Sequence, residues 1–449
     1  MFIHSNRFFR RITGDAMREW PNRQQLKQLI SGRVGKHFRK FRNEVIFVVI
    51  CTISLLCSVK SCNAALPQSN PSSCILTIFM VLKLQMLIVS SGPQVPCYFI
   101  FGDSIVDNGN NNDLVTQAKV NYPPYGVDFP GGIATGRFSN GETSADFLGK
   151  LLGFADYTPP FATARGSEIL KGVNYGSGGA GILAETGRNL GGRISLDLQL
   201  LNHGITVSRI NGLQQNITFS KEFLSKCIYT VNMGSNDYLN NYFLPKEYIT
   251  SRLYTPDEYA DVLIRHYSRQ LQILYNYGAR KVAIFGLGLV GCTPAEISIY
   301  GANASGCVDK INEAVALFNQ RIKPLVDELN SNLADAMFVY INSTNHALES
   351  PTSADFSVLS SPCCTASVSF GKGQCQPNLP PCSNRDMYIF WDEFHTTEKA
   401  NEASALRSYI AAYPSDSYPM DIRSLALLEN QPKNVVIQRR QQSMSTAKE

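Results

Sequence analysis

From Val95 onward, short apolar runs rich in β-branched and aromatic residues alternate with longer stretches in which apolar residues recur every three or four positions. The short runs are typical of buried strands, and the longer pattern is typical of amphipathic helices. Their alternation indicates a parallel sheet with crossover helices. The sequence therefore predicts an α/β domain with strands at residues 98–101, 173–175, 227–232, 281–285 and 337–341.

Two helices are the clearest of the predicted elements. Thr255 and Pro256 are typical of a helix start, and they predict a helix that continues to residue 277. A second helix is predicted over residues 309–333, where Pro324 predicts a kink. Its apolar stripe consists of Ile311, Val315, Phe318, Ile322, Leu325 and Leu329.

The first four predicted strands each end in a turn rich in glycine or asparagine. In a doubly wound sheet the carboxyl ends of the strands form the edge at which ligands bind. We therefore expect these turns to converge on one site, although they lie far apart in the chain. The turns begin at Gly102, Gly176, Met233 and Gly286.

Composition indicates a packed globular protein without a nucleic-acid surface. The chain has 449 residues, of which 44% are hydrophobic, so it can bury a large core. Its net charge of +5 comes from Arg and Lys gathered in residues 1–43 and near the C-terminus. The body between them is close to neutral, which excludes the basic footprint of a nucleic-acid-binding domain.

The N-terminal region has the features of a secretory leader. An apolar stretch over residues 45–59 follows a basic segment and precedes small residues at 61–65. A second apolar stretch, over residues 74–89, is short for a membrane span. We predict a leader over residues 1–92, a catalytic domain over 93–427 and a polar tail over 428–449, in a secreted protein. An uncleaved membrane anchor is the alternative.

Cysteine usage supports export. Eight of the 12 cysteines lie beyond the leader, and four of them crowd into a stretch rich in Gly, Pro and Ser, as in disulfide-stapled loops. A zinc site is the alternative for these four, but they lack a CxxC pair. Cys292 and Cys307 would close a short loop worth about 3 kcal/mol, and the other pairings stay open. Glycosylation sequons at Asn216, Asn303 and Asn342 also indicate export.

Three residues could carry acyl transfer from an ester. Ser104 follows the first strand and is the candidate nucleophile, while His395, far along the chain, is the candidate base. Asp392 lies three positions before the histidine and can fix its tautomer. The oxyanion donors would be the backbone N–H of Ser104, the backbone N–H of a glycine in Ser177-Gly178-Gly179 and the side-chain amide of Asn236.

A dinucleotide-binding site is a formal alternative, because Gly176 to Gly181 match G-x-G-x-x-G and Asp197 follows at a suitable distance. The motif lies after the second strand, however, and the residues that follow it indicate a loop. The G-x-S-x-G elbow is absent around Ser104, which argues against the α/β-hydrolase fold.

Linked blocks in this order resemble the plant-type GDSL esterases/lipases of the SGNH hydrolase superfamily. The resemblance covers residues 95–427. Its four main blocks are Phe101 to Asn112, Gly172 to Gly181, Gly234 to Tyr238 and Phe390 to His395, and residues 135–141, 286–294 and 382–386 are similar as well.

The resemblance implies a three-layer α/β/α fold with a flavodoxin-like parallel five-stranded sheet. It also implies an ester hydrolase without metal or cofactor, in which Ser104, Gly178, Asn236 and His395 hold the four name-giving roles and Asp392 completes the triad. An ester or lipid is the expected substrate, without an obligate protein partner. Acyl transfer to an alcohol and a non-catalytic secreted binding protein are the alternatives. The departures are Ile105, Gly176, Thr365-Ala366 and Thr396, of which Thr396 bears on how rigidly His395 is held.

Overall fold

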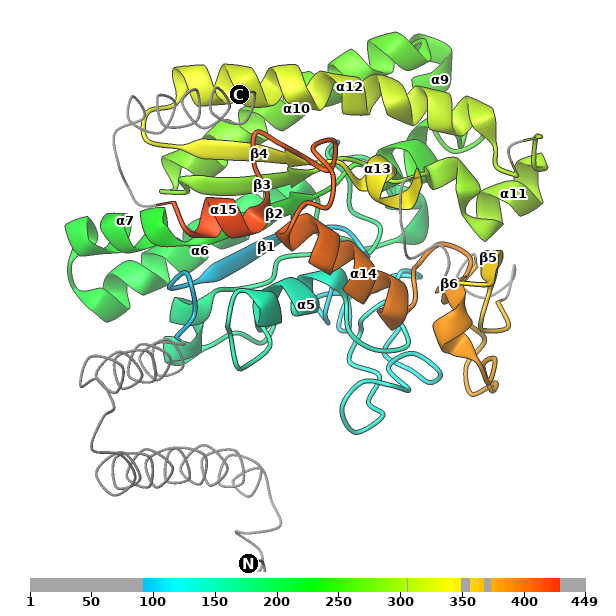
Figure 1. Ribbon diagram of the computed structural model, residues 1–449, viewed down its shortest axis with the longest axis horizontal. Helices are drawn as coiled ribbons and strands as arrows, with labels where there is room; N and C mark the ends of the chain where they lie inside the picture. Colours follow the sequence, from blue (N-terminus) through cyan, green and yellow to red (C-terminus); the bar gives the residue numbers. More distant parts are fainter. Residues whose placement is uncertain (1–91, 305, 349–355, 367–372, 429–449) are drawn as a thin grey trace, which may run out of the picture. The chain divides into compact units, whose positions relative to one another are not determined.

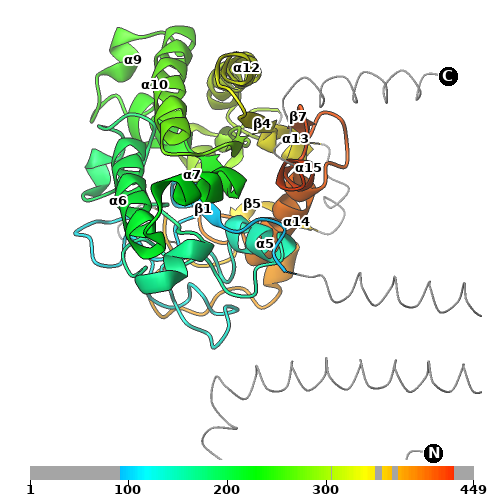
Figure 2. The same cartoon turned by 90° about the vertical axis from the view of Figure 1, so that its left-hand side faces the viewer.

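The computed structural model describes residues 92–304, 306–348, 356–366 and 373–428, so the predicted leader and tail fall almost entirely outside the described residues. The main sheet has four parallel strands in sequential order (Figure 1). A short fifth strand, labelled in Figure 2, runs antiparallel at one edge. In this order the strands are β1 (Tyr98–Gly102), β2 (Ile228–Asn232), β3 (Lys281–Phe285), β4 (Met337–Ile341) and β7 (Ser417–Tyr418).

Alternate strand residues belong to two separate cores, one on each face of the sheet. Phe99 and Tyr229 point to the first face, which is covered by α6 (Leu196–Gln214), α7 (Ile217–Lys226), α10 (Pro256–Asn276) and α12 (Asp309–Asn332). Ile100 and Ile228 point to the other face, which is covered by α5 (Ser144–Leu151), α14 (Glu398–Tyr409) and α15 (Ile422–Ala426). Figures 1 and 2 show these two helical layers around the sheet. The predicted three-layer α/β/α fold is therefore confirmed.

The predicted strand at residues 173–175 is reduced to isolated bridges. Asn174 makes isolated parallel bridges with Ile100, on the edge of β1 that β2 does not occupy, and with Pro160 on its other side. Its side-chain Oδ1 then accepts the N–H of Gly176 at 2.8 Å, so the backbone turns instead of continuing the ladder. This segment takes the position of the missing flavodoxin-like strand, and the fifth true strand is the antiparallel β7, which the sequence analysis did not predict.

The two predicted helices are confirmed. Thr255 caps α10 with a reciprocal capping box to Glu258, and α10 ends at Asn276. Helix α12 continues through Pro324 to Asn332 as one helix. The remaining helices are α8 (Ser235–Asp237), α9 (Thr250–Leu253), α11 (Pro294–Tyr300) and α13 (Ser343–Leu348), with 3-10 turns η1 (Gly166–Lys171), η2 (Arg188–Leu190), η4 (Val290–Cys292) and η6 (Arg385–Met387) and a π turn η3 (Tyr238–Tyr242). A separate parallel pair consists of β5 (Val358–Pro362) and β6 (Tyr388–Phe390).

The cysteines beyond the leader form disulfides. The predicted Cys292–Cys307 bond is present, and the other pairs are Cys97–Cys227, Cys363–Cys382 and Cys364–Cys375. The zinc alternative for the last four is therefore wrong, because disulfide bonds use all four thiols. Within the described segments, no helix is both long and apolar enough to cross a bilayer.

Candidate active site

Ser104 lies in the turn that follows β1, at the carboxyl edge of the sheet. The carbonyl of Asp103 accepts the N–H groups of Val106 and Asp107, and these bonds close the turn. Gly102 permits it, because a Cβ there would lie 2.6 Å from Cγ2 of Val106. The serine side chain is partly exposed, so a ligand can reach it.

The structure brings the three predicted triad residues together. Nε2 of His395 lies 2.7 Å from Oγ of Ser104. Nδ1 of His395 lies 2.9 Å and 2.8 Å from the two carboxylate oxygens of Asp392, which is fully buried. A hydroxyl, an imidazole and a carboxylate in this chain of contacts can move the serine proton to the imidazole.

A tight turn holds the imidazole and the carboxylate in place. The N–H of Trp391 donates to the carbonyl of His395 at 2.7 Å, and Asp392 Oδ1 accepts the N–H of His395 at 2.7 Å. Thr396, one of the departures from the family pattern, donates from Oγ1 to Oδ1 of Asn401 in α14 at 2.6 Å. The residue after the histidine is therefore anchored to a helix even though it is not proline.

Sequence reasoning missed Tyr125, whose O–H donates to Oδ2 of Asp392 at 2.6 Å. The tyrosine is buried and is far from Asp392 in the chain. It lies in a Tyr-Pro-Pro-Tyr-Gly segment that carries no recognisable chemical motif. Only the folded arrangement could have identified it.

Asn236 lies in α8, directly after β2, and its amide is oriented by neighbours. Its Oδ1 accepts an N–H from Asn240 at 2.7 Å, while its Nδ2 donates to the carbonyl of Ala180 at 2.9 Å. A primary amide has two N–H donors, so the bond to Ala180 leaves one for a ligand. The side chain of Asp237 connects α8 to the loop that follows Gly178, because it accepts the N–H groups of Ile182 and Leu183.

Gly178 and the triad residue His395 both lie beside one aromatic ring, that of Phe138. A Cβ at Gly178 would lie 2.7 Å from Cζ of Phe138, whose ring centroid is 4.7 Å from that of His395. The N–H of Gly178 donates to Oδ2 of Asp107 at 2.9 Å. Any ligand oxygen that uses this N–H must therefore share it with the Asp107 carboxylate.

Buried carboxyl groups border the site. Burial raises the pKa of Asp103, the residue before the serine, to about 6, although the N–H of Ile105 and the nearby His395 act in the opposite direction. Burial also raises the pKa of Asp107 to about 6 and that of Asp237 to about 7. Asp103 Oδ2 has no hydrogen-bond partner among the described residues. Burial therefore raises the pKa of all three carboxyl groups above the ordinary range of aspartate.

The other histidines of the described structure and the glycine-rich stretch at residues 176–181 do not form a second catalytic site. His203 and His346 are buried and His266 is exposed, and none of them contacts the triad. Residues 176–181 form a loop with no helix directly after it, so the structural context of a dinucleotide site is missing. Asp197 instead accepts a hydrogen bond from Gln270.

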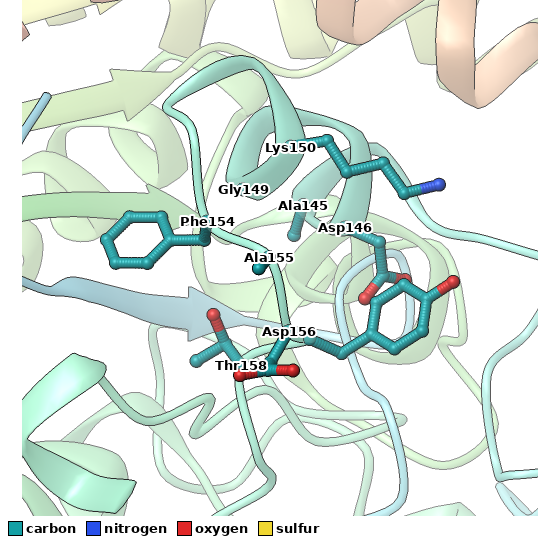
Figure 3. Close-up of a pocket in the computed structure, with 9 residues that line it drawn as sticks. Ala145, Asp146, Gly149, Lys150, Phe154, Ala155, Asp156 and Thr158 are labelled. Carbon is teal, nitrogen blue, oxygen red and sulfur yellow. The ribbon is translucent and has the colours of Figure 1, made fainter. Parts of the chain in front are cut away.

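A small cavity of about 110 Å³ lies beside α5, as Figure 3 shows. Lys150 and Asp146 project from α5, and Phe154 and Asp156 come from the following loop. Asp146 is already paired with Arg137 at 2.7 Å. None of the triad residues lines this cavity.

Comparison with known proteins identifies the family. The sequence profile described as GDSL-like lipase/acylhydrolase matches residues 98–407, a span that contains every residue of the candidate site. GDSL esterase/lipase At1g29670 of Arabidopsis thaliana is 48% identical over 358 residues, which cover 79% of this chain and 98% of that protein. GDSL esterase/lipase At5g45670 of the same plant is 46% identical over 359 residues, which cover 79% and 99%. The chain therefore belongs to the GDSL-like lipase/acylhydrolase family, and with its three-layer fold it is a serine hydrolase of carboxylic esters.

Proposed function

We propose that the protein cleaves carboxylic esters through an acyl intermediate on Ser104. The observation that carries the proposal is the 2.7 Å contact between Oγ of Ser104 and Nε2 of His395. In the first step Oγ attacks the ester carbonyl, His395 takes the serine proton, and the same proton then goes to the departing alkoxide. In the second step water attacks the acyl-serine and passes its proton to His395, which returns it to Oγ as the acid leaves.

Asp392 and Asn236 have supporting roles in this proposal. The Asp392 carboxylate holds the proton of Nδ1, so that Nε2 faces the serine as an acceptor. The negative charge that develops on the carbonyl oxygen is stabilised by the N–H of Ser104 and the second N–H of Asn236. The N–H of Gly178 is a third donor to the carbonyl oxygen of the ester, which shares this N–H with the Asp107 carboxylate.

The test is an assay of the purified protein on a series of esters of short and long acyl chains, including glycerolipids and acetylated polysaccharides. Ser104→Ala is expected to abolish turnover, while Ser208→Ala, at an exposed position of α6, keeps wild-type rates. Wild-type rates in Ser104→Ala would overturn the mechanism. Labelling of the wild-type serine by a fluorophosphonate separates an enzyme from a binding protein that has lost its chemistry.

Acyl transfer is the second reaction that the same acyl-serine permits, because an alcohol can replace water in the second step. Product analysis with a competing alcohol measures the balance between the two reactions. A hydrolase gives mainly the free acid, and an acyltransferase gives mainly the new ester.

Secretion is also part of the proposal, and the four disulfides support it, because such bonds form and persist in oxidising compartments. Mass spectrometry of protein from its native tissue is the test. We expect a mature N-terminus beyond residue 59 and glycan on the exposed Asn216 and Asn303. An intact N-terminus together with unglycosylated sequons would contradict secretion.

A further inference from the structure

The Cys364–Cys375 disulfide bridge is connected to the acid of the triad by two routes, one from each cysteine. Cys364 is bonded to Cys375, and its N–H donates to the carbonyl of Trp391 at 2.9 Å. The N–H of Cys375 donates to the phenol oxygen of Tyr125 at 3.1 Å. Tyr125 in turn donates its own proton to Asp392. The Cys364–Cys375 disulfide bridge therefore supports Trp391, the residue before the acid, directly and supports Asp392 through Tyr125.

The hydroxyl of Tyr125 has a fixed orientation. Its oxygen accepts the N–H of Cys375, which directs its proton to Oδ2 of Asp392, 2.6 Å away. The ring packs edge-on against Trp391 and Phe138, with centroids 6.4 Å and 6.5 Å apart. Burial and the charge of Asp392 raise the pKa of Tyr125 well above its ordinary value, so the phenol stays a donor.

Oδ2 of Asp392 is shared between two partners. It lies 2.8 Å from Nδ1 of His395 and 2.6 Å from the Tyr125 oxygen. Oδ1 accepts the backbone N–H groups of Phe394 and His395. A neutral donor on a carboxylate stabilises its charge and weakens its pull on other protons. The strength of the Tyr125 contact therefore changes how strongly Asp392 holds the imidazolium.

We propose that Tyr125 is a positioning residue of the esterase reaction, whose O–H fixes the plane of Asp392 and sets the proton affinity of His395. The inference rests on the proposed roles of Asp392 and His395. The other ionisable groups near the pair are Asp103 on the β1 turn, Glu393 beside the acid, and Tyr122. Substitution of Tyr125 leaves all three in place.

Tyr122 provides a matched control. It lies in the same segment as Tyr125, and its O–H donates to the carbonyl of the same Cys375 at 3.0 Å. It makes no hydrogen bond to Asp392 in the described structure. Tyr122→Phe therefore removes a hydrogen bond to Cys375 without removing a donor from Asp392.

The experiment measures kcat, KM and the pH profile of kcat/KM for hydrolysis of a short acyl ester. In Tyr125→Phe we expect kcat to fall about tenfold with KM unchanged, and the acidic limb to move up by about half a pH unit. The limb moves up because Asp392, without the donor, stabilises the imidazolium more strongly. Tyr122→Phe should keep the wild-type limb.

A second variant covers the case in which Tyr125→Phe does not fold. Site-specific 3,5-difluorotyrosine at position 125 keeps the ring and the hydroxyl but is a stronger donor, so the limb should move to lower pH. Coincidence of the wild-type limb with that of the difluorotyrosine protein would overturn the inference, as would an unmoved limb in a folded Tyr125→Phe. A wild-type protein inactive on every ester would instead overturn the proposed function.

Discussion

The ring of Phe138 packs against His395, with its centroid 4.7 Å from the imidazole centroid, and its Cζ lies beside Gly178. Gly178→Ala should therefore push this ring toward the base, because the new Cβ would lie 2.7 Å from Cζ of Phe138 and 2.9 Å from Nδ2 of Asn111. Overpacking of this kind costs about 1–3 kcal/mol of stability. We expect a lower unfolding midpoint and a reduced kcat in the same variant.

The control for that variant is Gly212→Ala, since nothing lies within 4 Å of a Cβ at Gly212 and the residue lies in α6. This substitution should stabilise the protein by about 0.5–1 kcal/mol and leave kcat unchanged. Thermal unfolding and steady-state kinetics on the pair decide the matter. Equal behaviour of the two alanine variants would refute the steric role of Gly178.

Asn236→Ala should lower kcat about a hundredfold or more with KM nearly constant, because the amide acts on charge that develops in the transition state. Asn240→Ala removes one of the two groups that orient the amide, together with an acceptor for Asn189, so roughly a tenfold loss is expected there. Asn332→Ala, at an exposed position, is the reference variant. Steady-state kinetics on one short ester measures all three, and a large rise in KM with constant kcat in Asn236→Ala would argue against an oxyanion role.

Two of the short disulfide loops should have different consequences when they are opened. Replacement of both Cys292 and Cys307 by serine should cost about 3 kcal/mol of stability and leave kcat nearly unchanged. This loop reaches the triad turn through the N–H of Ala295, which donates to the carbonyl of Glu393 at 3.1 Å, and Ala295 is held by helix α11 rather than by the disulfide. Replacement of Cys364 and Cys375 should lower kcat as well, since their N–H groups reach Trp391 and Tyr125. Denaturant unfolding and kinetics on the two double variants are the measurement. Retained full activity in the second would disprove the link.

His203 should make the fold sensitive to acid. It is fully buried, its ring lies edge-on to Phe99 and Tyr229, and burial lowers its pKa to about 3. An unfolded histidine takes up a proton near pH 6.5, so the stability this residue contributes is complete above that pH. It decreases as the pH falls from there toward 3.

The measurement compares unfolding midpoints at pH 7 and pH 4. His203→Gln keeps a hydrogen-bonding group near Tyr175, whose O–H lies 3.1 Å from Nδ1 of His203, but does not titrate. Its midpoint should fall less between the two pH values than that of the wild type, while the exposed His266→Gln should follow the wild type. An identical acid response in all three proteins would rule out the assignment.

The fold was predictable where one pattern decided the structure. Each of the four parallel strands, β1 to β4, is a short apolar run that the sequence shows directly. Thr255 and Glu258 form the capping box that begins α10. The segment at Val173 has the same composition as a strand, but the side chain of Asn174 competes for the backbone, which composition does not reveal. The two-residue β7 is too short for any periodicity to detect.

The candidate residues of the site could be selected from the sequence because each adjoins a strand end or a compact motif, and the structure brings Ser104, Asp392 and His395 together. Ser104 and Asn236 follow strands whose carboxyl ends share one edge of the sheet, and Asp392 and His395 are three positions apart. Tyr125 could not be found in this way. Its contact with Asp392 depends on how two distant loops pack, and a tyrosine between prolines and glycine carries no spacing rule.

The short strand β7 also limits how much unpaired backbone the edge of the main sheet exposes. An uncovered outer strand offers a row of unpaired backbone groups on which another polypeptide can add and start aggregation. Ser417 and Tyr418 pair with the outer side of β4, Pro419 follows them, and at the opposite margin Asn174 pairs with Ile100. Both margins are therefore partly occupied by segments too short to offer a new template. These short segments reduce the length of unpaired backbone that the main sheet offers to another polypeptide.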